Sequence, residues 1–460
     1  MNRREVLELL YDRYIEPTKG KDGRYIGVEI EMPLINLDKE AVDFAVVHDL
    51  TRKFRDEFGF YTAVVDENGD ACSVTDFSND DILSYDCSYN NLELSFGKET
   101  DLLKIQSRFE RYYWFLQARL TGQHYTLSGL GVNPYRIYNH NVPIPNARYR
   151  MLFHHLSSYD KYRLPMFFHP YPDYGMFSSA SQIQLDVGYD DLIETIRAFT
   201  LLEPLKAILF SNSVLTGDRE DMLCCRDMLW ENSTHGINLH NVGMFDTPPA
   251  NIDELLEYIA STSIYCTGQD GRYINFPPVN IVEYFGRDTI RGEYFEDGAY
   301  REIEFTPRES DINYLRSFKF EDLTWRGTIE FRSVCCQPIK DAFTVAAFHL
   351  GLIGRARELN ELLGADRALY GHGYNASELR KLFNLRAWPG FADRAAVSKL
   401  LLHILDLAKA SLASRGLGEE RFLEPLYGRA ERLTNPAREL LRRTDAGEDV
   451  ASVIRDYAQP

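Results

Sequence analysis

Four short segments of the chain alternate apolar and polar residues, which is the pattern of β-strands with one buried face. They span residues 25–32, 91–96, 182–187 and 328–334. Each apolar face needs a layer of helices behind it, because a half-apolar sheet has to bury that face. The pattern therefore predicts a sheet with helices on one side and polar side chains on the other.

Most of the remaining chain repeats apolar residues three and four positions apart, which predicts amphipathic helices. In the first two thirds these are residues 3–14, 40–58, 100–120 and 190–211. Beyond Asp341 the pattern is almost wholly helical, with segments at 343–363, 395–414 and 436–443. Because the sequence contains no internal repeats or flexible linkers, we expect one α+β catalytic body over residues 1–340. A helical C-terminal portion, residues 341–460, should pack on the same domain.

The polar faces of the four predicted strands share one chemical theme. They carry Glu29 and Glu31; Asn91, Glu93 and Ser95; Gln182 and Gln184; and Glu330 and Arg332. Glu29 and Glu31 lie two residues apart, so their side chains share a face about 7 Å apart. Asp86, in the Ser/Asn-rich turn before the second strand, can fold back towards the same side. A single strand with acidic residues on its polar face would be interpreted as an ordinary half-solvated strand. Four strands with polar faces of this kind together predict an acidic site.

So many carboxylates on one concave face repel one another strongly unless cations are bound. Oxygen-only ligands favour Mg²⁺ or Mn²⁺, which typically bridge carboxylates to nucleotide phosphates. Arg332 at the rim of the cluster suits the oxygens of a transferring phosphoryl group. The sequence has no Walker A motif and no kinase signature. The residues thus indicate metal-dependent phosphoryl transfer from a nucleotide.

The composition of the chain excludes some classes of binding partner. The 460 residues carry 51 Lys and Arg against 69 Asp and Glu, a net charge of -18. This charge disfavours nucleic acid or an anionic membrane as a partner. Since no apolar stretch approaches about 18 residues and the start lacks a signal peptide, we expect a cytoplasmic protein. Seven cysteines without a CxxC spacing indicate buried thiols rather than disulfides or zinc ligands.

Taken in order, the motifs are similar to those of a known family. They are Gly27–Glu31 (Gly-Val-Glu-Ile-Glu), Asp86 with Glu93, Pro145 with Arg148-Tyr149, Gln182–Asp186, Ser211–Ser213, Arg226 with Trp230, and Glu330–Arg332. Their ordered set resembles the glutamate-cysteine ligase family (γ-glutamylcysteine synthetases). The layout is closest to the plant-type branch, which is also found in many bacteria. The correspondence covers nearly the whole chain.

This resemblance implies a fold and a reaction. The fold would be a curved, mostly antiparallel sheet that forms an active-site funnel with helices outside, as in glutamine synthetase and guanido kinases. In the reaction, ATP would phosphorylate the γ-carboxylate of L-glutamate, and an amine would then displace phosphate to give an amide. L-Cysteine is the leading acceptor. Such an enzyme would be a monomer or a homodimer with small-molecule substrates.

The resemblance also implies roles for individual residues. Mg²⁺ (or Mn²⁺) would be held by Glu29, Glu31, Asp86, Glu93, Gln182 and Glu330. Arg332 and Arg326 would stabilise the transferring phosphoryl group. The amino-acid substrates would meet Arg148, Tyr149, Arg226 and Trp230, together with Gln184, Asn91 and Ser95 on the strand faces. One of the arginines would grip an α-carboxylate through a bidentate hydrogen bond.

Three departures from the family pattern concern the acceptor. Ile30 stands between the two acids, where a basic residue is common in this branch, and Ser333–Cys336 replace acidic or small polar residues. Ser178–Ser181 lack an Arg-Thr pair. A carboxylate-amine ligase with a different acceptor therefore stays open. So do a ligase-like binding module, which would turn over no substrate, and a hydrolase with metal-activated water, which would need no ATP.

Overall fold

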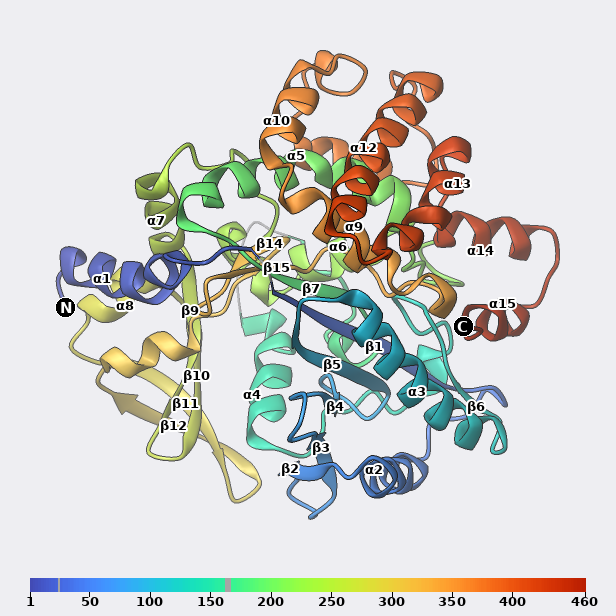
Figure 1. Cartoon of the computed structure of the whole chain (residues 1–460). Helices are drawn as coiled ribbons and strands as arrows, with labels where there is room; N and C mark the ends of the chain where they lie inside the picture. Colours follow the sequence, from blue (N-terminus) through green and yellow to red (C-terminus); the bar gives the residue numbers. More distant parts are fainter. Residues whose placement is uncertain (24, 162–166) are drawn as a thin grey trace.

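The computed structural model of the chain describes residues 1–23, 25–161 and 167–460. Its centre is a sheet in the order β14-β15-β7-β1-β5-β4-β3-β2, and β6 also pairs with β1 (Figure 1). Every pairing in it is antiparallel. The strands are β1 (Ile26–Asn36), β2 (Tyr61–Val65), β3 (Ala71–Thr75), β4 (Ile82–Tyr85), β5 (Asn91–Glu99), β6 (Tyr125–Leu127), β7 (Ser181–Asp186), β14 (Glu321–Leu323) and β15 (Thr328–Phe331). The four predicted strands are β1, β5, β7 and β15, side by side.

Helices cover the apolar face of this sheet, as the strand pattern requires. Three of them are α3 (Leu102–Thr121), α5 (Leu192–Phe210) and α9 (Thr344–Ile353). Val28 and Ile30 of β1 belong to one buried cluster with Ile105, Phe199 and Phe348 from these helices. Helix α5 is buried on nearly all sides, because the sheet lies on one side of it and C-terminal helices lie on the other. The predicted α+β fold with an antiparallel sheet and outer helices is confirmed.

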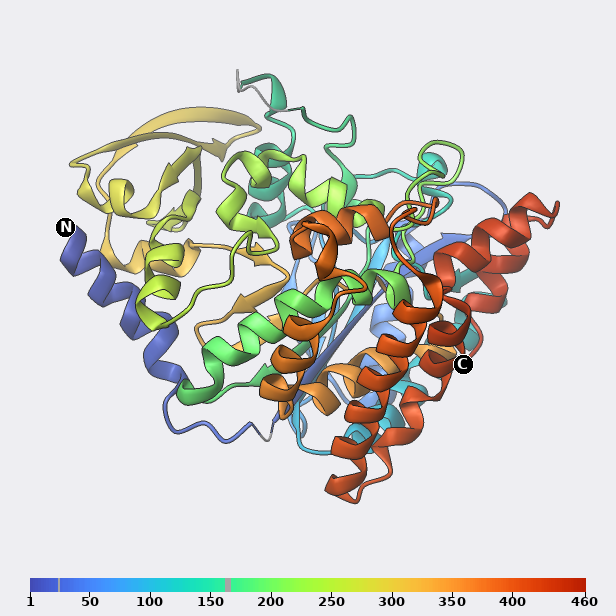
Figure 2. The ribbon, with the colours of Figure 1, turned by 90° about the horizontal axis from the view of Figure 1, so that it is seen from above.

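The C-terminal helices gather on one side of the molecule, in orange and red in Figures 1 and 2. They are α10 (Ala356–Ala365), α11 (Ala376–Phe383), α12 (Arg394–Arg415), α13 (Glu424–Arg432), α14 (Pro436–Asp445) and α15 (Val450–Tyr457). The predicted helix over 343–363 is broken after Ile353, where the chain turns through Gly354 and Arg355. Leu401 and Leu405 of α12 join the cluster that contains β1, so the sheet and these helices share one apolar core.

A second sheet, which the periodicity did not predict, lies beside the N-terminal helix (Figure 1). Its order is β12-β11-β10-β9, from β9 (Ser263–Gln269), β10 (Arg272–Asn280), β11 (Ile290–Glu296) and β12 (Ala299–Phe305). It packs with α1 (Arg3–Leu10), α7 (Ile252–Ala260) and α8 (Ile281–Gly286) around its own buried cluster, which includes Leu10, Ile264 and Phe276. Helix α4 (Ala147–Leu156) lies between the two sheets.

Two further expectations concern membranes and thiols. Among the described residues, no helix combines the length and the apolar character that crossing a bilayer requires. All seven cysteines are buried with free thiols, as predicted. Cys224 and Cys335 come closest, with their sulfur atoms 3.6 Å apart.

Candidate active site

A cavity of about 940 Å³ opens over the polar face of the central sheet. Strands β1, β5, β7 and β15 form its floor. Its walls come from α4, from α6 (Cys225–Glu231) and from the segment 314–326, which includes β13 (Phe318–Lys319) and β14. The described residues that line it include aromatic side chains as well as the acidic strand residues, so one end is strongly polar and the other is suited to organic groups.

The register of the sheet brings the acidic residues together on this floor. Glu29 stands opposite Gln182 on one neighbouring strand and Ser95 on the other. Glu31 stands opposite Glu93, and Glu330 stands opposite Gln184. Facing residues of an antiparallel pair have Cβ atoms about 4.5–5.5 Å apart. Neighbouring strands therefore place these carboxyl and amide groups within reach of a common ligand.

Hydrogen bonds hold several of these carboxylates in place. Glu31 accepts from the amide nitrogen of Ala180 at 2.7 Å and from Nε2 of Gln182 at 2.6 Å. Glu29 accepts from Nε2 of Gln184 at 3.0 Å. The amide nitrogens of Gln182 and Gln184 thus point to carboxylates, so their amide oxygens can accept from or bind a different partner. For Gln182, this Oε1 atom is buried and has no hydrogen-bond partner among the described residues.

The floor carries more negative charge than its surroundings neutralise. Burial raises the pKa of Glu31 to about 8 and that of Glu93 to about 7, and in both cases the charge of Asp86 adds to the effect. The pKa of Glu29 lies well above its usual range because of burial, followed by the charges of Glu330 and Glu93. Burial likewise raises the pKa of Asp86. Such a set favours either protons or bound cations.

The donor set fits a hard divalent cation. The polar groups of β1, β5, β7 and β15 in the lining include several carboxylates and the unpartnered amide oxygen of Gln182. Cys87 lines the cavity beside Asp86, but burial and the charge of Asp86 raise the pKa of its thiol well above the usual range, so the carboxylates are the stronger ligands. Oxygen ligands on several strands suit Mg²⁺ or Mn²⁺, which bind through a few carboxylates and keep remaining positions for substrate phosphates.

Arginines border the acidic floor. Nη1 of Arg332 donates to Glu330 at 2.6 Å. Burial alone would lower the pKa of this guanidinium, but the charges of Glu330 and Asp322 outweigh burial and raise it. Arg326, exposed at the rim, donates to Oε1 of Gln184 at 2.9 Å. Arg226 lines the cavity with one long hydrogen bond, from Nη1 to the carbonyl oxygen of Ser333 at 3.5 Å.

A comparison with known families identifies what this arrangement is. The family model of glutamate-cysteine ligase family 2 (GCS2) matches residues 25–456. The chain belongs to this family. It is therefore an ATP-dependent ligase, its family acts on glutamate, and enzymes of this kind use ATP with a divalent metal. The resemblance seen in the sequence motifs is confirmed.

Two solved structures match the chain over nearly its whole length. A glutamate-cysteine ligase from Francisella tularensis, solved in complex with AMP, matches with a TM-score of 0.49 and 10% identity over 96% of this chain and 89% of that one. A bifunctional glutathione synthetase from Pasteurella multocida matches with a TM-score of 0.48 and 12% identity over 99% of this chain. This chain covers 53% of that enzyme's length. No curated protein sequence matches the chain.

The ligase brings nearly all of the residues predicted from its sequence to one cavity. The lining contains Glu29, Glu31, Asp86, Glu93, Gln182, Glu330, Arg332, Arg326, Arg148, Tyr149, Gln184, Arg226, Trp230 and Ser95. Ser95 donates to Glu93, and the hydroxyl of Tyr149 donates to the carbonyl oxygen of Tyr85 at 3.0 Å. The ring of Trp230 stacks on Phe318 with their centroids 4.7 Å apart. Their catalytic roles stay predictions.

Asn91 is the exception. It is fully buried, donates to the carbonyl oxygen of Ser178 at 3.0 Å, and accepts from the hydroxyl of Ser179 at 2.6 Å. Asn91 shares the strand face of Glu93, but the segment that contains Ser178 and Ser179 covers this end of the strand. Its side chain anchors that segment instead of lining the ligase cavity.

Sequence reasoning missed the strand at the edge of the acidic floor, β14. Asp322 lies opposite Glu330 in the β14–β15 hairpin and lines the cavity. Burial raises its pKa to about 7, although the nearby Arg332 acts in the opposite direction. A signal was present, because Gly327 closes a tight turn between two short polar-apolar segments, and its φ of 68° favours glycine. Arg316 and Tyr265 also line the cavity, and they carry no sequence signal.

The raised carboxyl pKa values predict a metal effect that grows with pH. Protonated Glu31 and Glu93 stabilise the metal-free fold below about pH 4.5, and this contribution is lost as pH rises through about 7 to 8. Bound Mg²⁺ replaces those protons. We therefore expect Mg²⁺ to raise the melting temperature more at pH 8.5 than at pH 5.5. Calorimetry with matched KCl as the control measures this difference, and equal shifts at both pH values would contradict the assignment.

Proposed function

We propose that this ligase activates the γ-carboxylate of L-glutamate with ATP and joins it to an amine, with L-cysteine as the first acceptor. The observation that carries the proposal is the acidic floor. Buried carboxyl groups on neighbouring strands, with raised pKa values and the unpartnered oxygen of Gln182 beside them, form a site for cations and their phosphate ligands.

The metal roles follow from the donor chemistry of this floor. We assign the ligands as Glu29, Glu31, Asp86, Glu93, Gln182 and Glu330. Bound there, Mg²⁺ (or Mn²⁺) would neutralise the triphosphate and the attacking carboxylate, which otherwise repel one another. The protein side chains themselves carry no nucleophile in this scheme. Their task is to place two anionic substrates against each other and to keep the reacting atoms aligned.

In the first step, a γ-carboxylate oxygen of glutamate attacks the γ-phosphorus of ATP. The bond from that phosphorus to the β–γ bridging oxygen breaks, and ADP leaves with the electron pair. Arg332 lines the cavity beside Glu330, so its guanidinium can donate hydrogen bonds to the equatorial oxygens as charge spreads over them. Arg326 at the rim offers a second cation on the same side.

In the second step, the amine nitrogen attacks the acyl carbon of γ-glutamyl phosphate. The carbon–oxygen bond to the phosphate breaks, the nitrogen loses a proton, and the amide and inorganic phosphate remain. The α-carboxylate of glutamate needs a guanidinium away from the reacting end. Arg226 fits this role, because it lines the cavity and its Nε atom has no hydrogen-bond partner among the described residues. Arg148 and Trp230 complete this wall.

Family membership supports L-cysteine as the acceptor, whereas the departures from the family's sequence pattern favour a different one. Ile30 lies on the buried face of β1 and therefore does not reach the cavity, so the missing basic residue at this position changes the core rather than the site. Ser333 lies in the lining next to Arg332. Cysteine is the first acceptor to test, and a ligase for another amine or amino acid is the alternative.

The test is ADP release by the purified ligase with Mg²⁺, ATP and L-glutamate, with and without acceptors. We expect release to depend on glutamate and to rise with L-cysteine, with γ-glutamylcysteine identified by mass spectrometry. Hydroxylamine serves as a general acceptor, since it traps γ-glutamyl phosphate as a hydroxamate whatever the natural amine is. Hydroxamate without cysteine turnover would favour the alternative acceptor. No glutamate-dependent ADP in any mixture would overturn the proposed donor.

A further inference from the structure

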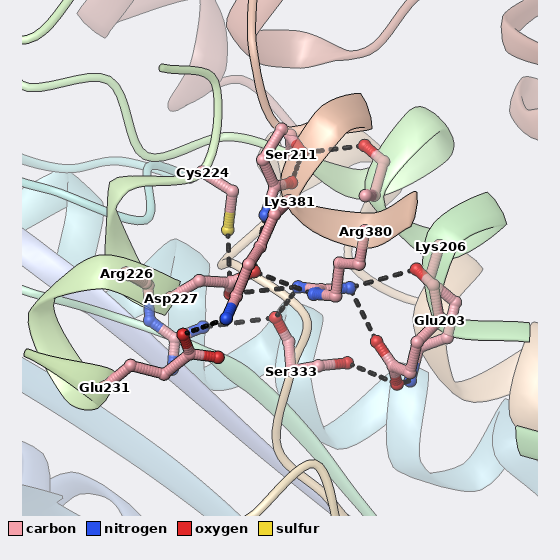
Figure 3. A network of polar contacts seen from close by, with 12 residues as sticks. Glu203, Lys206, Ser211, Cys224, Arg226, Asp227, Glu231, Ser333, Arg380 and Lys381 are labelled. Carbon is pink, nitrogen blue, oxygen red and sulfur yellow. Dashed lines mark hydrogen bonds and ion pairs between the residues drawn. The ribbon is translucent and has the colours of Figure 1, made fainter. Parts of the chain in front are cut away.

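A buried network of charged side chains (Figure 3) adjoins the cavity, whose lining includes Asp227 and Ser333. At its centre is Arg380 of α11, only 3% exposed. Its Nε donates to Asp227 Oδ2 at 2.7 Å and its Nη2 donates to Asp227 Oδ1 at 3.0 Å, a bidentate pair. Its Nη1 donates to Oε2 of Glu203 in α5 at 2.5 Å. One guanidinium from the C-terminal helices thus connects α5 and α6.

The same guanidinium also reaches the segment directly after β15, which carries Arg332. Nη2 of Arg380 donates to the carbonyl oxygen of Ser333 at 3.4 Å, and the hydroxyl of Ser333 donates to Glu203 at 2.9 Å. That carbonyl oxygen also accepts from Arg226. Ser333 directly follows Arg332, and Asp227 directly follows Arg226. Two of the arginines that we assign to the reaction, Arg226 and Arg332, are therefore next in sequence to a residue that Arg380 holds.

Stability alone does not account for so many buried charges. Replacing a buried ion pair by apolar residues of similar volume is often neutral or stabilising. Here burial would raise the pKa of Glu203, but Lys206 and Arg380 outweigh it and lower the pKa to about 2. The group therefore stays charged, with Lys206 and Arg380 as its cationic partners. Asp227 is the second carboxylate that Arg380 binds, and Glu321 is a third carboxyl group buried beside Glu203. The hydrogen bonds of the network are directional, so they fix the orientation of α6 and of the end of β15, which an apolar core would not do.

We propose that Arg380 is a positioning residue of the ligase site, which fixes Asp227 and Ser333 and thereby the directions of Arg226 and Arg332. The inference rests on the proposed function for its catalytic consequence. It gives the C-terminal helices a role in the reaction, although none of their described residues lines the cavity. It also accounts for Ser333, a departure from the family pattern, because its hydroxyl and carbonyl groups are both bonded within this network.

The test compares Arg380→Lys and Arg380→Gln with the wild type. Lysine restores a positive charge between Glu203 and Asp227 but cannot form the bidentate pair. We expect Arg380→Lys to recover much of the melting temperature lost in Arg380→Gln. It should nevertheless keep a KM for L-glutamate raised about tenfold and a kcat lowered about tenfold, since small misplacements are costly in catalysis. The KM for ATP should stay within about twofold.

Arg429 provides a matched control. It is a buried arginine of α13, 6% exposed, that donates to Asp341 and Gln337 at 2.7 Å each and does not line the cavity. Arg429→Lys should lose stability to a similar degree and keep the wild-type KM for glutamate. The inference is overturned if both lysine variants, or neither, change this KM. It is also overturned if Arg380→Lys restores KM together with the melting temperature.

Hydrogen exchange separates this inference from the proposed function. Amides of α6 should exchange at least about tenfold faster in Arg380→Gln than in Arg429→Gln, whichever acid the enzyme activates. Equal exchange in the two variants would overturn the positioning role, whereas wild-type protein without glutamate turnover would overturn only the proposed function. If Arg380→Gln does not fold, Asn384→Ala and Ser333→Ala remain. Asn384→Ala removes an amide that donates to Asp227 and accepts from Ser211, and Ser333→Ala removes a hydroxyl that donates to Glu203. Each should raise the same KM more modestly.

Discussion

Replacing Glu93 by Gln is expected to lower kcat/KM on the order of 10³-fold while leaving the metal-free ligase at least as stable as the wild type. Glutamine keeps the shape of the side chain but removes one charge from the crowded floor. In the metal-free protein this relieves repulsion from Asp86, which together with burial holds the pKa of Glu93 at about 7. With substrates present, the same change removes an anionic metal ligand. Steady-state ADP release and calorimetry in EDTA measure the two effects.

Glu99→Gln is the control for this variant, since Glu99 lies at the other end of β5 and outside the cavity lining. It should keep turnover within about twofold of the wild type. The protection by Mg²⁺ should shrink in Glu93→Gln and persist in Glu99→Gln. Near-normal turnover of Glu93→Gln, with full protection by Mg²⁺, would contradict the assignment of Glu93 as a metal ligand.

The floor of the site was predictable because it depends on a local rule. Alternation along a strand decides which side chains share a face, and the acids of β1, β5 and β15 obey it. The sequence did not contain the pairing order, yet only a shared sheet could place Glu29, Glu93 and Glu330 on one surface with their apolar neighbours buried. Asn91 shows the limit of the rule. Its face was right, but a distant segment covers it.

The buried network around Arg380 was not predictable, because it depends on contacts between distant parts of the chain. Arg380 meets Glu203, 177 positions earlier, and Asp227, 153 positions earlier. Nothing in an amphipathic pattern distinguishes a buried arginine of this kind from an exposed one. The second sheet was missed for a related reason. Its strands β11 and β12 are half-exposed and rich in charged residues, so they lack a clear apolar face.

Arg332→Ala is expected to lower kcat on the order of 10³-fold and to change the KM for ATP by no more than about threefold. Its guanidinium matters most when charge spreads over the transferring phosphoryl group, whereas the cations on the floor carry most of the binding of the triphosphate. Arg332→Lys keeps the charge but loses the fork of donors, so part of the rate should return. Rapid-quench measurement of the first turnover, with hydroxylamine to trap the acyl phosphate, isolates this step.

The position of Arg332 makes the comparison with Arg326 informative. Arg332 forms an ion pair with Glu330 at 2.6 Å, so its removal leaves a carboxylate that should bind cations more tightly, not less. A loss of rate at saturating Mg²⁺ therefore reports on the phosphoryl step rather than on a lost metal. Arg326 is exposed and bonded to Gln184 at the rim, so Arg326→Ala should cost only about tenfold. Weaker ATP binding with a normal first turnover in Arg332→Ala would instead assign this arginine to nucleotide binding.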